Sequence, residues 1–173
     1  LGRNDQGQDG YQDVDFSITT RELAKMIRLA GIEFMKLEDE PYDNPLGEYT
    51  GAGVIFGATG GVMEAALRTA VEKLTGDELI NLDFVDVRGV KGVKEAEYDL
   101  QGQKVKVAVA SGLANARVIL DKVKAGEADY TFIEIMGCPG GCVNGGGQPH
   151  VDSQIRNFMD VRAERAKGLY TLD

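Results

Sequence analysis

The stretch from residue 104 to residue 136 constrains the fold more than any other part of the sequence. Its first part, KVKVAVAS, places Val105, Val107 and Val109 at alternate positions, which is typical of a β-strand with one buried face. Helical spacing follows at 115–125, and YTFIEIM at 130–136 has the β-branched and aromatic residues of a second strand. Two strands joined through a helix need a crossover connection, which is usually right-handed. The sequence therefore predicts an α/β fold, with a mixed or parallel sheet flanked by helices.

The rest of the chain adds further helices and short strands. One helix is predicted from Thr19 or Thr20 to Gly31, and a second at 62–74 before Gly76. We expect the second helix to bury one face, formed by Met63, Ala66, Ala70 and Leu74. Its charges at Glu64, Arg68 and Glu72 are spaced for pairing along the helix surface. The other expected elements are strands at 14–18, 84–89 and 93–100, a loop at 38–53, and a polar C-terminal helix from about residue 153. Residues 1–12 are predicted to be a linker or a disordered end, which leaves 13–173 as the folded part.

Composition excludes several classes of function. The chain has 28 acidic and 19 basic residues, a net charge of -9, and no basic stripe, which argues against a nucleic-acid partner. No apolar run reaches the roughly 18 residues of a membrane span, so none is expected. Two cysteines are too few for a secreted disulfide framework. Because the chain begins at Leu1 rather than Met, we expect it to be processed or excised from a longer protein.

Both cysteines lie in one glycine-rich loop, EIMGCPGGCVNGGGQPH at 134–150. Cys138 and Cys142 could be buried structural thiols, or could form a disulfide that closes a very short loop. They could also bind zinc with His150 as a third ligand, although zinc usually takes four nitrogen or sulfur ligands. An iron–sulfur cluster would explain why cysteines and glycines occur together, because small residues let backbone amides approach the inorganic sulfurs. The residues alone leave these alternatives open.

A second glycine-rich stretch, GAGVIFGATGGVMEAALR, lies at 51–68. It is a weak match to a dinucleotide-binding fingerprint, since Gly51, Gly53 and Gly57 follow GxGxxxG spacing without a firm preceding strand. Close packing at a turn would also explain it. The functional alternative is that Gly60 and Gly61 open a helix whose first amides face an anionic group.

Together, the two stretches resemble the catalytic domain of the iron-only, or [FeFe], hydrogenases. EIMGCPGGCVNGGGQPH is similar to that family's third cysteine motif, and FGATGGVMEAALR to a second well-marked segment. VDFSITTRELAKMI, LGEYTGAG and VKEAEYDL resemble the flanking pieces, so the likeness covers about residues 13–172. It implies that residues 13–173 form the C-terminal lobe of a two-lobed catalytic domain.

The resemblance also implies a cofactor and a reaction. The family's H-cluster is a [4Fe–4S] cubane joined through one cysteine to a two-iron subcluster that carries CO, cyanide and a dithiolate, and it interconverts H2 with two protons and two electrons. By this likeness Cys138 is a cubane ligand and Cys142 the bridging thiolate. Met136, Phe56 and Val62 would line the two-iron site, Gly57 would approach its diatomic ligands, and Gly60 and Gly61 would open the anion-facing helix.

The sequence departs from the family in several ways. The earlier motifs of TSCCP and PCxxK type are missing, and with them two cubane cysteines, a proton-relaying cysteine and a cyanide-pairing lysine. Gly137 replaces a more usual alanine. We therefore expect this chain alone to be inactive, with the H-cluster absent or incomplete, and its exposed lobe face to favour self-association.

The resemblance further implies partners and a location. The partners are the N-terminal remainder of the catalytic subunit and a redox partner such as ferredoxin or an NAD(P)-linked subunit. The expected location is the cytoplasm of an anaerobic bacterium, with the periplasm as the alternative. The runner-up function is a non-catalytic hydrogenase-like iron–sulfur protein, an assembly factor or a sensor. The assembly factors usually carry serine where Gly140 stands and diverge at FGATGG, which favours the enzyme.

Overall fold

The computed structural model describes residues 11–41, 51–76, 84–89, 91–100 and 102–173. The chain divides into two compact units. The first comprises residues 1–43 and 146–150, and the second comprises residues 44–145 and 151–173. Most of the predicted linker at 1–12, and much of the predicted loop at 38–53, lies outside the described residues.

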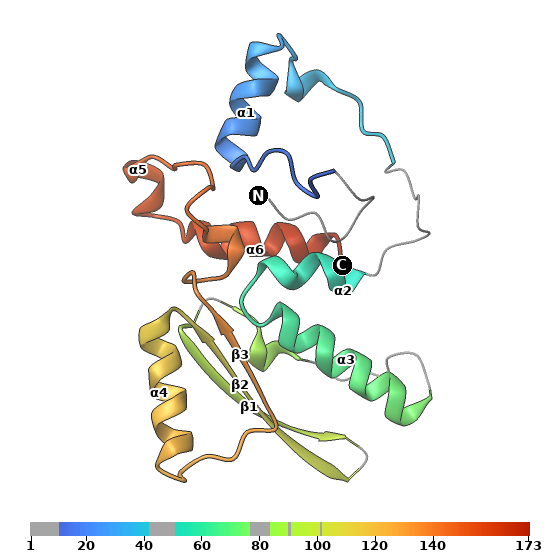
Figure 1. The fold of residues 1–173 in the computed structure, drawn as a ribbon, viewed down its shortest axis with the longest axis vertical. Coiled ribbons are helices and arrows are strands. Elements are labelled where there is room, and N and C mark those ends of the chain that lie inside the picture. The colour runs from blue at the N-terminus through green and yellow to red at the C-terminus, as the bar shows by residue number, and fades with distance from the viewer. Residues whose placement is uncertain (1–10, 42–50, 77–83, 90, 101) are drawn as a thin grey trace. The chain divides into compact units, whose positions relative to one another are not determined.

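The second unit is built on a three-stranded mixed sheet in the order β1-β2-β3 (Figure 1). Strand β1 (Val93–Leu100) runs antiparallel to β2 (Gln103–Ser111), and β3 (Phe132–Met136) runs parallel to β2. Helix α4 (Leu113–Lys124) makes the crossover between the two parallel strands. The predicted strand–helix–strand unit and the mixed α/β sheet are therefore confirmed.

Helices cover both faces of the sheet (Figure 1). Helix α3 (Gly61–Thr75) packs Met63, Leu67 and Val71 against β1 and β2, where Val107 and Val109 are fully buried. The opposite face is covered by α4, whose Ala116 and Ile119 contact the alanines of β2. Because β2 is buried on both faces, alanines alternate with its valines, where a half-exposed strand would carry polar residues.

Three sequence predictions about local structure are wrong. Residues 84–89 form a 3₁₀ turn at Val85–Val87, because burying Phe84 and Val87 together requires three-residue spacing. Residues 14–18 form no strand, and Phe16 is 87% exposed. The buried face of α3 runs through Leu67 and Val71, whereas Leu74 is 49% exposed.

Shorter helices complete the second unit. Helix α2 (Gly51–Val54) and a 3₁₀ turn at Ile55–Gly57 precede α3, so the predicted loop ends in helical structure. The predicted C-terminal helix is two helices, α5 (Ser153–Arg156) and α6 (Val161–Thr171). The carboxylates of Asp152 and Asp160 cap the two helices by accepting hydrogen bonds from their first amides.

The first unit contains helix α1 (Thr20–Leu29) and a 3₁₀ turn at Phe34–Lys36. A capping box starts α1: the hydroxyl of Thr19 accepts from the amide of Glu22, whose carboxylate accepts from the Thr19 amide. Arg21 donates to the carbonyl oxygens of Gly146 (2.7 Å) and Gln148 (3.0 Å). The predicted helix is confirmed, and of the two predicted N-cap residues the structure selects Thr19.

A buried ion cluster links α3 to Arg88, which follows the 3₁₀ turn at Val85–Val87, and to Tyr170 of α6. Glu64 is 0% exposed and accepts two hydrogen bonds from Arg88 (2.5 and 2.8 Å) and one from Arg68 (2.6 Å). The Arg88 guanidinium also lies 4.9 Å from the ring centroid of Tyr170. Burial alone would raise the pKa of Glu64, but the hydrogen bonds from Arg88 and Arg68 outweigh it and hold that pKa below its usual value. The predicted pairing of Glu64 with Arg68 is confirmed, whereas the burial of Glu64 and its bond to Arg88 were not predicted.

We predict that Glu64→Gln lowers the free energy of unfolding by about 2–3 kcal/mol. The change leaves the Arg88 charge uncompensated, and its cost stays below that of a fully enclosed ion because Arg88 is partly exposed to water. Urea unfolding of the chain measures it. Glu72→Gln, on the exposed side of the same helix, is the matched control and should cost no more than about 0.5 kcal/mol. Equal losses in the two variants would contradict the account.

The same cluster makes stability depend on pH. Because the pKa of Glu64 is lowered on folding from its usual value of 4.5, its contribution is complete above that value. It is lost as the pH falls through the lower, folded-state pKa. Urea midpoints of the wild type should therefore fall more steeply below about pH 4.5 than those of Glu64→Gln. Parallel curves for the two proteins would show that Glu64 carries no such linkage.

Candidate functional site

The two cysteines lie on the loop that leaves the carboxyl end of β3. Neither forms a disulfide, so the disulfide alternative is wrong for this structure; Cys138 is half-buried and Cys142 is exposed. The loop turns tightly, because the amide of Gly141 donates to the carbonyl of Cys138 (3.0 Å), and a 3₁₀ turn at Cys142–Asn144 follows. A rigid strand and a hydrogen-bonded turn thus hold both thiols at one edge of the sheet.

The loop packs directly on the second glycine-rich stretch. The amide of Thr59 donates to the carbonyl of Gly140 at 3.1 Å. A Cβ atom at Gly141 would lie 2.6 Å from the carbonyl oxygen of Gly57 and 2.7 Å from the Thr59 nitrogen, so only glycine permits this approach. Gly140 and Gly141 also have φ angles of +89° and +99°, which other residues rarely adopt. The structure therefore brings together the two stretches that the sequence singled out.

Gly60 and Gly61 do not offer their amides to a ligand, contrary to the expectation from sequence. The amide of Gly60 donates to the Glu134 carboxylate at 2.6 Å, and that of Gly61 donates to the carbonyl of Ala58. A side chain at Gly60 would overlap the carbonyl oxygen of Val87, and one at Gly61 would overlap that of Ile55. Both glycines are therefore required by internal packing, and the anion at the start of α3 comes from this chain.

The other predicted site residues belong to these two stretches. Phe56 is 47% exposed in the turn before α3, and Gly57 is half-buried against Leu169. Val62 is half-buried in the first turn of α3. Met136 ends β3 half-buried, and its carbonyl accepts a hydrogen bond from Gly112 at 2.7 Å. Their roles toward a cofactor stay predictions.

Two buried charges beside the site were missed by sequence analysis. Glu134 is 6% exposed, and its carboxylate also accepts a hydrogen bond from the amide of Met63 at 2.7 Å. Lys94 is 5% exposed and donates to the carbonyls of Thr59 (3.0 Å) and Gly89 (2.9 Å). One signal was present: Glu134 stands between two isoleucines in a five-residue strand, where an inward charge needs partners.

Burial changes the pKa of Lys94. Loss of hydration lowers the pKa of the Lys94 ammonium to about 8, although the Glu134 charge opposes that change. At neutral pH the ammonium is still protonated. Its charge is therefore held in the core together with the opposite charge of Glu134.

The described residues give the zinc alternative no support. They contain no group of three or more histidine, cysteine, aspartate or glutamate side chains that could hold a metal ion. Cys138 and Cys142 therefore offer a thiolate pair without a complete ligand set.

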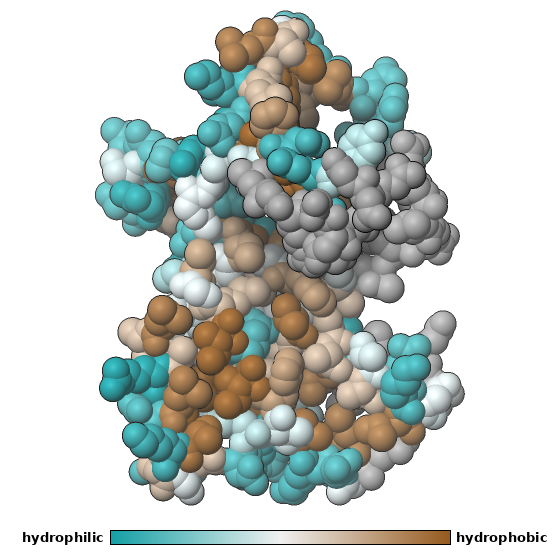
Figure 2. All heavy atoms as spheres, viewed as in Figure 1, coloured by the Kyte–Doolittle hydropathy of each residue, from teal (hydrophilic) through white to brown (hydrophobic). Residues whose placement is uncertain are grey.

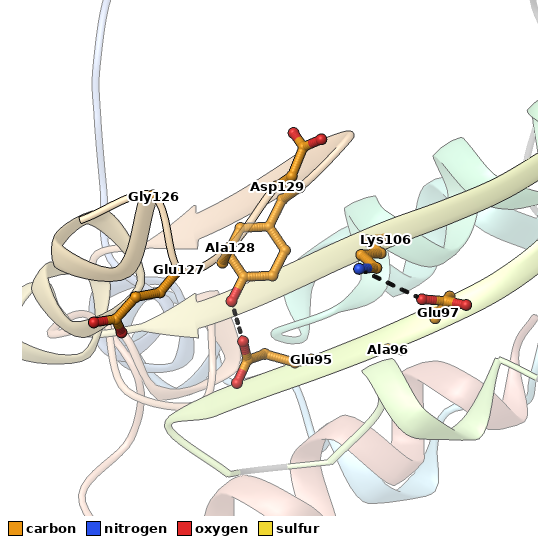
Figure 3. A pocket seen from close by; sticks show the side chains of 9 residues that line it. Glu95, Ala96, Glu97, Lys106, Gly126, Glu127, Ala128 and Asp129 are labelled. Carbon is orange, nitrogen blue, oxygen red and sulfur yellow. Dashed lines mark hydrogen bonds and ion pairs between the residues drawn. The ribbon is translucent and has the colours of Figure 1, made fainter. Parts of the chain in front are cut away.

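Two further features of the described structure carry no functional assignment. None of its helices combines the length and the hydropathy needed to cross a bilayer. A pocket of about 470 Å³ lies beside β1 and β2 and is lined by charged side chains (Figure 3). There Glu95 accepts a hydrogen bond from Tyr130, and Glu97 pairs with Lys106 at 3.8 Å.

Two cysteines outside any disulfide lie among close-packed glycines at the end of a parallel strand, and cysteine thiolates are the usual ligands of iron–sulfur clusters. The model of one family, "Iron only hydrogenase large subunit, C-terminal domain", matches residues 2–146. The chain belongs to this family of iron-only hydrogenases.

Individual relatives agree with this assignment. The chain is 51% identical over 166 residues to iron hydrogenase 1 of Clostridium pasteurianum, covering 96% of the chain and 29% of the relative. It is 55% identical over 140 residues to the periplasmic [Fe] hydrogenase large subunit of Nitratidesulfovibrio vulgaris, covering 81% and 33%. The chain thus spans about a third of the length of these relatives.

Solved structures show the same fold. A variant of the [FeFe]-hydrogenase HydA1 from Chlamydomonas reinhardtii is similar with a TM-score of 0.65 at 38% identity, covering 90% of this chain and 45% of that one. A more distant relative is the cytosolic iron-sulfur assembly component 3 of Bos taurus, 30% identical over 162 residues, covering 91% and 34%.

We predict that Gly141→Ala destabilises the second unit by roughly 2–4 kcal/mol. The new Cβ would strain a left-handed backbone and press on the Gly57 carbonyl, opening the contact between the two stretches. Urea unfolding measures the loss, and faster hydrogen exchange at the Thr59 amide locates it. Gly137→Ala is the matched control, because nothing lies within 4 Å of its Cβ position, and it should cost no more than about 0.5 kcal/mol. If alanine were tolerated equally at both positions, the close approach would not be required.

Proposed function

We propose that this chain forms the C-terminal lobe, residues 13–173, of an [FeFe]-hydrogenase catalytic subunit. In the whole enzyme it would hold part of the H-cluster through Cys138 and Cys142. The hydrogen bond from Thr59 to Gly140 carries the proposal. This bond joins the two sequence stretches on which the family resemblance rests, although 80 residues of chain separate them.

The residues present fit two of the four ligand positions of a cubane. A [4Fe–4S] cluster takes four thiolates, and this sequence contains two cysteines. Their loop is bare of bulky side chains, with two glycines in left-handed conformations between them, which suits a large inorganic cluster. The two remaining thiolates would come from the N-terminal remainder of the catalytic subunit.

The bound H-cluster, a cubane with a two-iron subcluster, would supply the reversible conversion of H2 into two protons and two electrons. This chain would contribute the bridging thiolate, Cys142, and one further cubane ligand, Cys138. Phe56, Val62 and Met136 would exclude water from the two-iron site, and Gly57 would leave room for its small ligands. In this proposal Gly60 and Gly61 position the turn and do not touch the cofactor, because their amides are bound within the chain.

Electrons would pass to a redox partner such as ferredoxin or an NAD(P)-linked subunit. The proposed location is the cytoplasm of an anaerobic bacterium, with the periplasm as the alternative. The proposal groups the chain with the catalytic hydrogenases rather than with the assembly factors. Its sequence identity to the hydrogenases is higher, and residue 140 is glycine, where the assembly factors usually carry serine.

Exposed apolar side chains gather over α4 and the adjoining sheet edge (Figure 2). The exposed apolar residues of α4 and β3 include Leu113, Val118, Leu120, Phe132 and Ile135. Such a surface on an isolated chain favours self-association, which would hide it from water.

Two preparations test the function: the chain alone, and a chimera in which it replaces the 166 matching residues of Clostridium pasteurianum iron hydrogenase 1. After cofactor maturation, we expect hydrogen-dependent dye reduction by the chimera and none by the chain alone, which has only two cubane ligands. Cys138→Ser or Cys142→Ser should abolish reduction by the chimera and lower its iron content, with Gly137→Ala as the control. An active chain alone would overturn the fragment assignment. A chimera that binds iron without turnover, or full activity in both serine variants, would overturn the proposed site.

A further inference from the structure

We propose that Lys94 and Glu134 are positioning residues that clamp the Thr59–Gly60 peptide, and so fix the turn at residues 57–61 against the cysteine loop at residues 138–142. The clamp itself is seen in the structure. Its importance for a cofactor rests on the proposed function.

The two charged residues occupy one row across the sheet. Lys94 on β1 is in register with Val109 on β2, and Val109 is in register with Glu134 on β3. Residues in one row project to the same face, and two strand spacings separate the outer pair by about 10 Å. This is the face that α3 covers. The ammonium and the carboxylate therefore rise on either side of Val109, beneath the start of α3.

The peptide between Thr59 and Gly60 receives a hydrogen bond from one charge and gives one to the other. Its carbonyl oxygen accepts from the Lys94 ammonium at 3.0 Å, and its N–H donates to the Glu134 carboxylate at 2.6 Å. The second carboxylate oxygen of Glu134 accepts from the amide of Met63 at 2.7 Å, which adds a charge-assisted cap to α3. Opposite charges on the two polar ends of one peptide fix its orientation.

The same turn is bonded to the cysteine loop. The amide on the other side of Thr59 donates to the carbonyl of Gly140, which lies between the two cysteines. Glu134 lies on β3, which ends at Met136, two residues before Cys138. The Glu134 side chain thus binds the turn at residues 57–61, and its own strand, β3, leads directly into the cysteine loop. A displacement of the clamped peptide would be passed to the loop through the Thr59–Gly140 hydrogen bond and through the close packing of Gly141 on residues 57–59.

A purely structural role explains this arrangement poorly. Burying a carboxylate and an ammonium costs more than burying apolar side chains of similar size, and such replacements often stabilise proteins. Several core positions of the same sheet face are indeed apolar, including Leu100, Val107 and Val109. Two charges in the row beneath the turn are therefore better explained by a need to fix the geometry of the turn than by a gain in stability.

The test uses Glu134→Gln, which keeps the size of the side chain but replaces one acceptor with a donor, and Lys94→Met. Glu97→Gln, an exposed charge on β1, is the matched control. The first readout is hydrogen exchange of the wild-type chain and its variants, with no cofactor. We expect the Gly60, Met63 and Thr59 amides to exchange about tenfold faster or more in Glu134→Gln, since a charge-assisted hydrogen bond is lost, and to be unchanged in Glu97→Gln.

The second readout is the infrared spectrum of the carbon monoxide and cyanide ligands in the matured chimera. We expect their bands to shift in Glu134→Gln and Lys94→Met, and to keep their wild-type positions in Glu97→Gln. Unchanged bands together with unchanged exchange in both clamp variants would overturn the proposal. If Glu134→Gln fails to fold, the same two readouts are measured on Glu134→Asp. This variant keeps the negative charge, but its side chain is one methylene shorter, which moves the carboxylate away from the clamped peptide.

The two proposals fail in different ways. If the wild-type chimera shows no carbon monoxide or cyanide bands, the proposed function is wrong, while hydrogen exchange still decides whether the clamp exists. If the wild type shows the bands and the clamp variants show the same ones with faster exchange, the clamp is structural only, and its role at the site is overturned.

Discussion

The hydrogen bond between Thr59 and Gly140 is the contact on which the rest of the site depends. It joins a turn before α3 to the loop after β3, two segments far apart in the sequence. Glycine makes the contact feasible, since a Cβ atom at Gly141 would meet the backbone of residues 57–59. The loop that carries the thiols is therefore shaped by backbone packing.

Charge in the core orients the elements around that contact. Glu64 binds α3 to Arg88 in the following segment, and Glu134 binds the first turn of α3 to the sheet. Each carboxylate is matched by guanidinium or amide donors, as a buried anion requires. Because each such contact depends on direction, these pairs specify where α3 lies more sharply than apolar packing alone would.

Local pattern predicted much of the fold, and long-range partners account for most of what it missed. Alternating valines predicted β2, and helical spacing of apolar residues predicted α3 and α4, because both periodicities can be seen among residues that are close together in the sequence. FVDVRG alternates as a strand would, yet burial of Phe84 with Val87 selects a turn. Glu64 resembled a surface charge paired with Arg68, because its second partner, Arg88, lies 24 residues away. The partners of Glu134 lie more than 70 residues away, so the sequence showed only that an inward charge would need them.

The central claim is that Cys138 and Cys142 together ligate iron beside the glycine-lined turn. Anomalous X-ray diffraction at the iron absorption edge, on crystals of the assembled catalytic subunit, tests it most directly. The account predicts iron density within bonding distance of both sulfur atoms, with the backbone of residues 57–61 alongside. Iron density remote from either thiol, or a closed disulfide between the two, would contradict it.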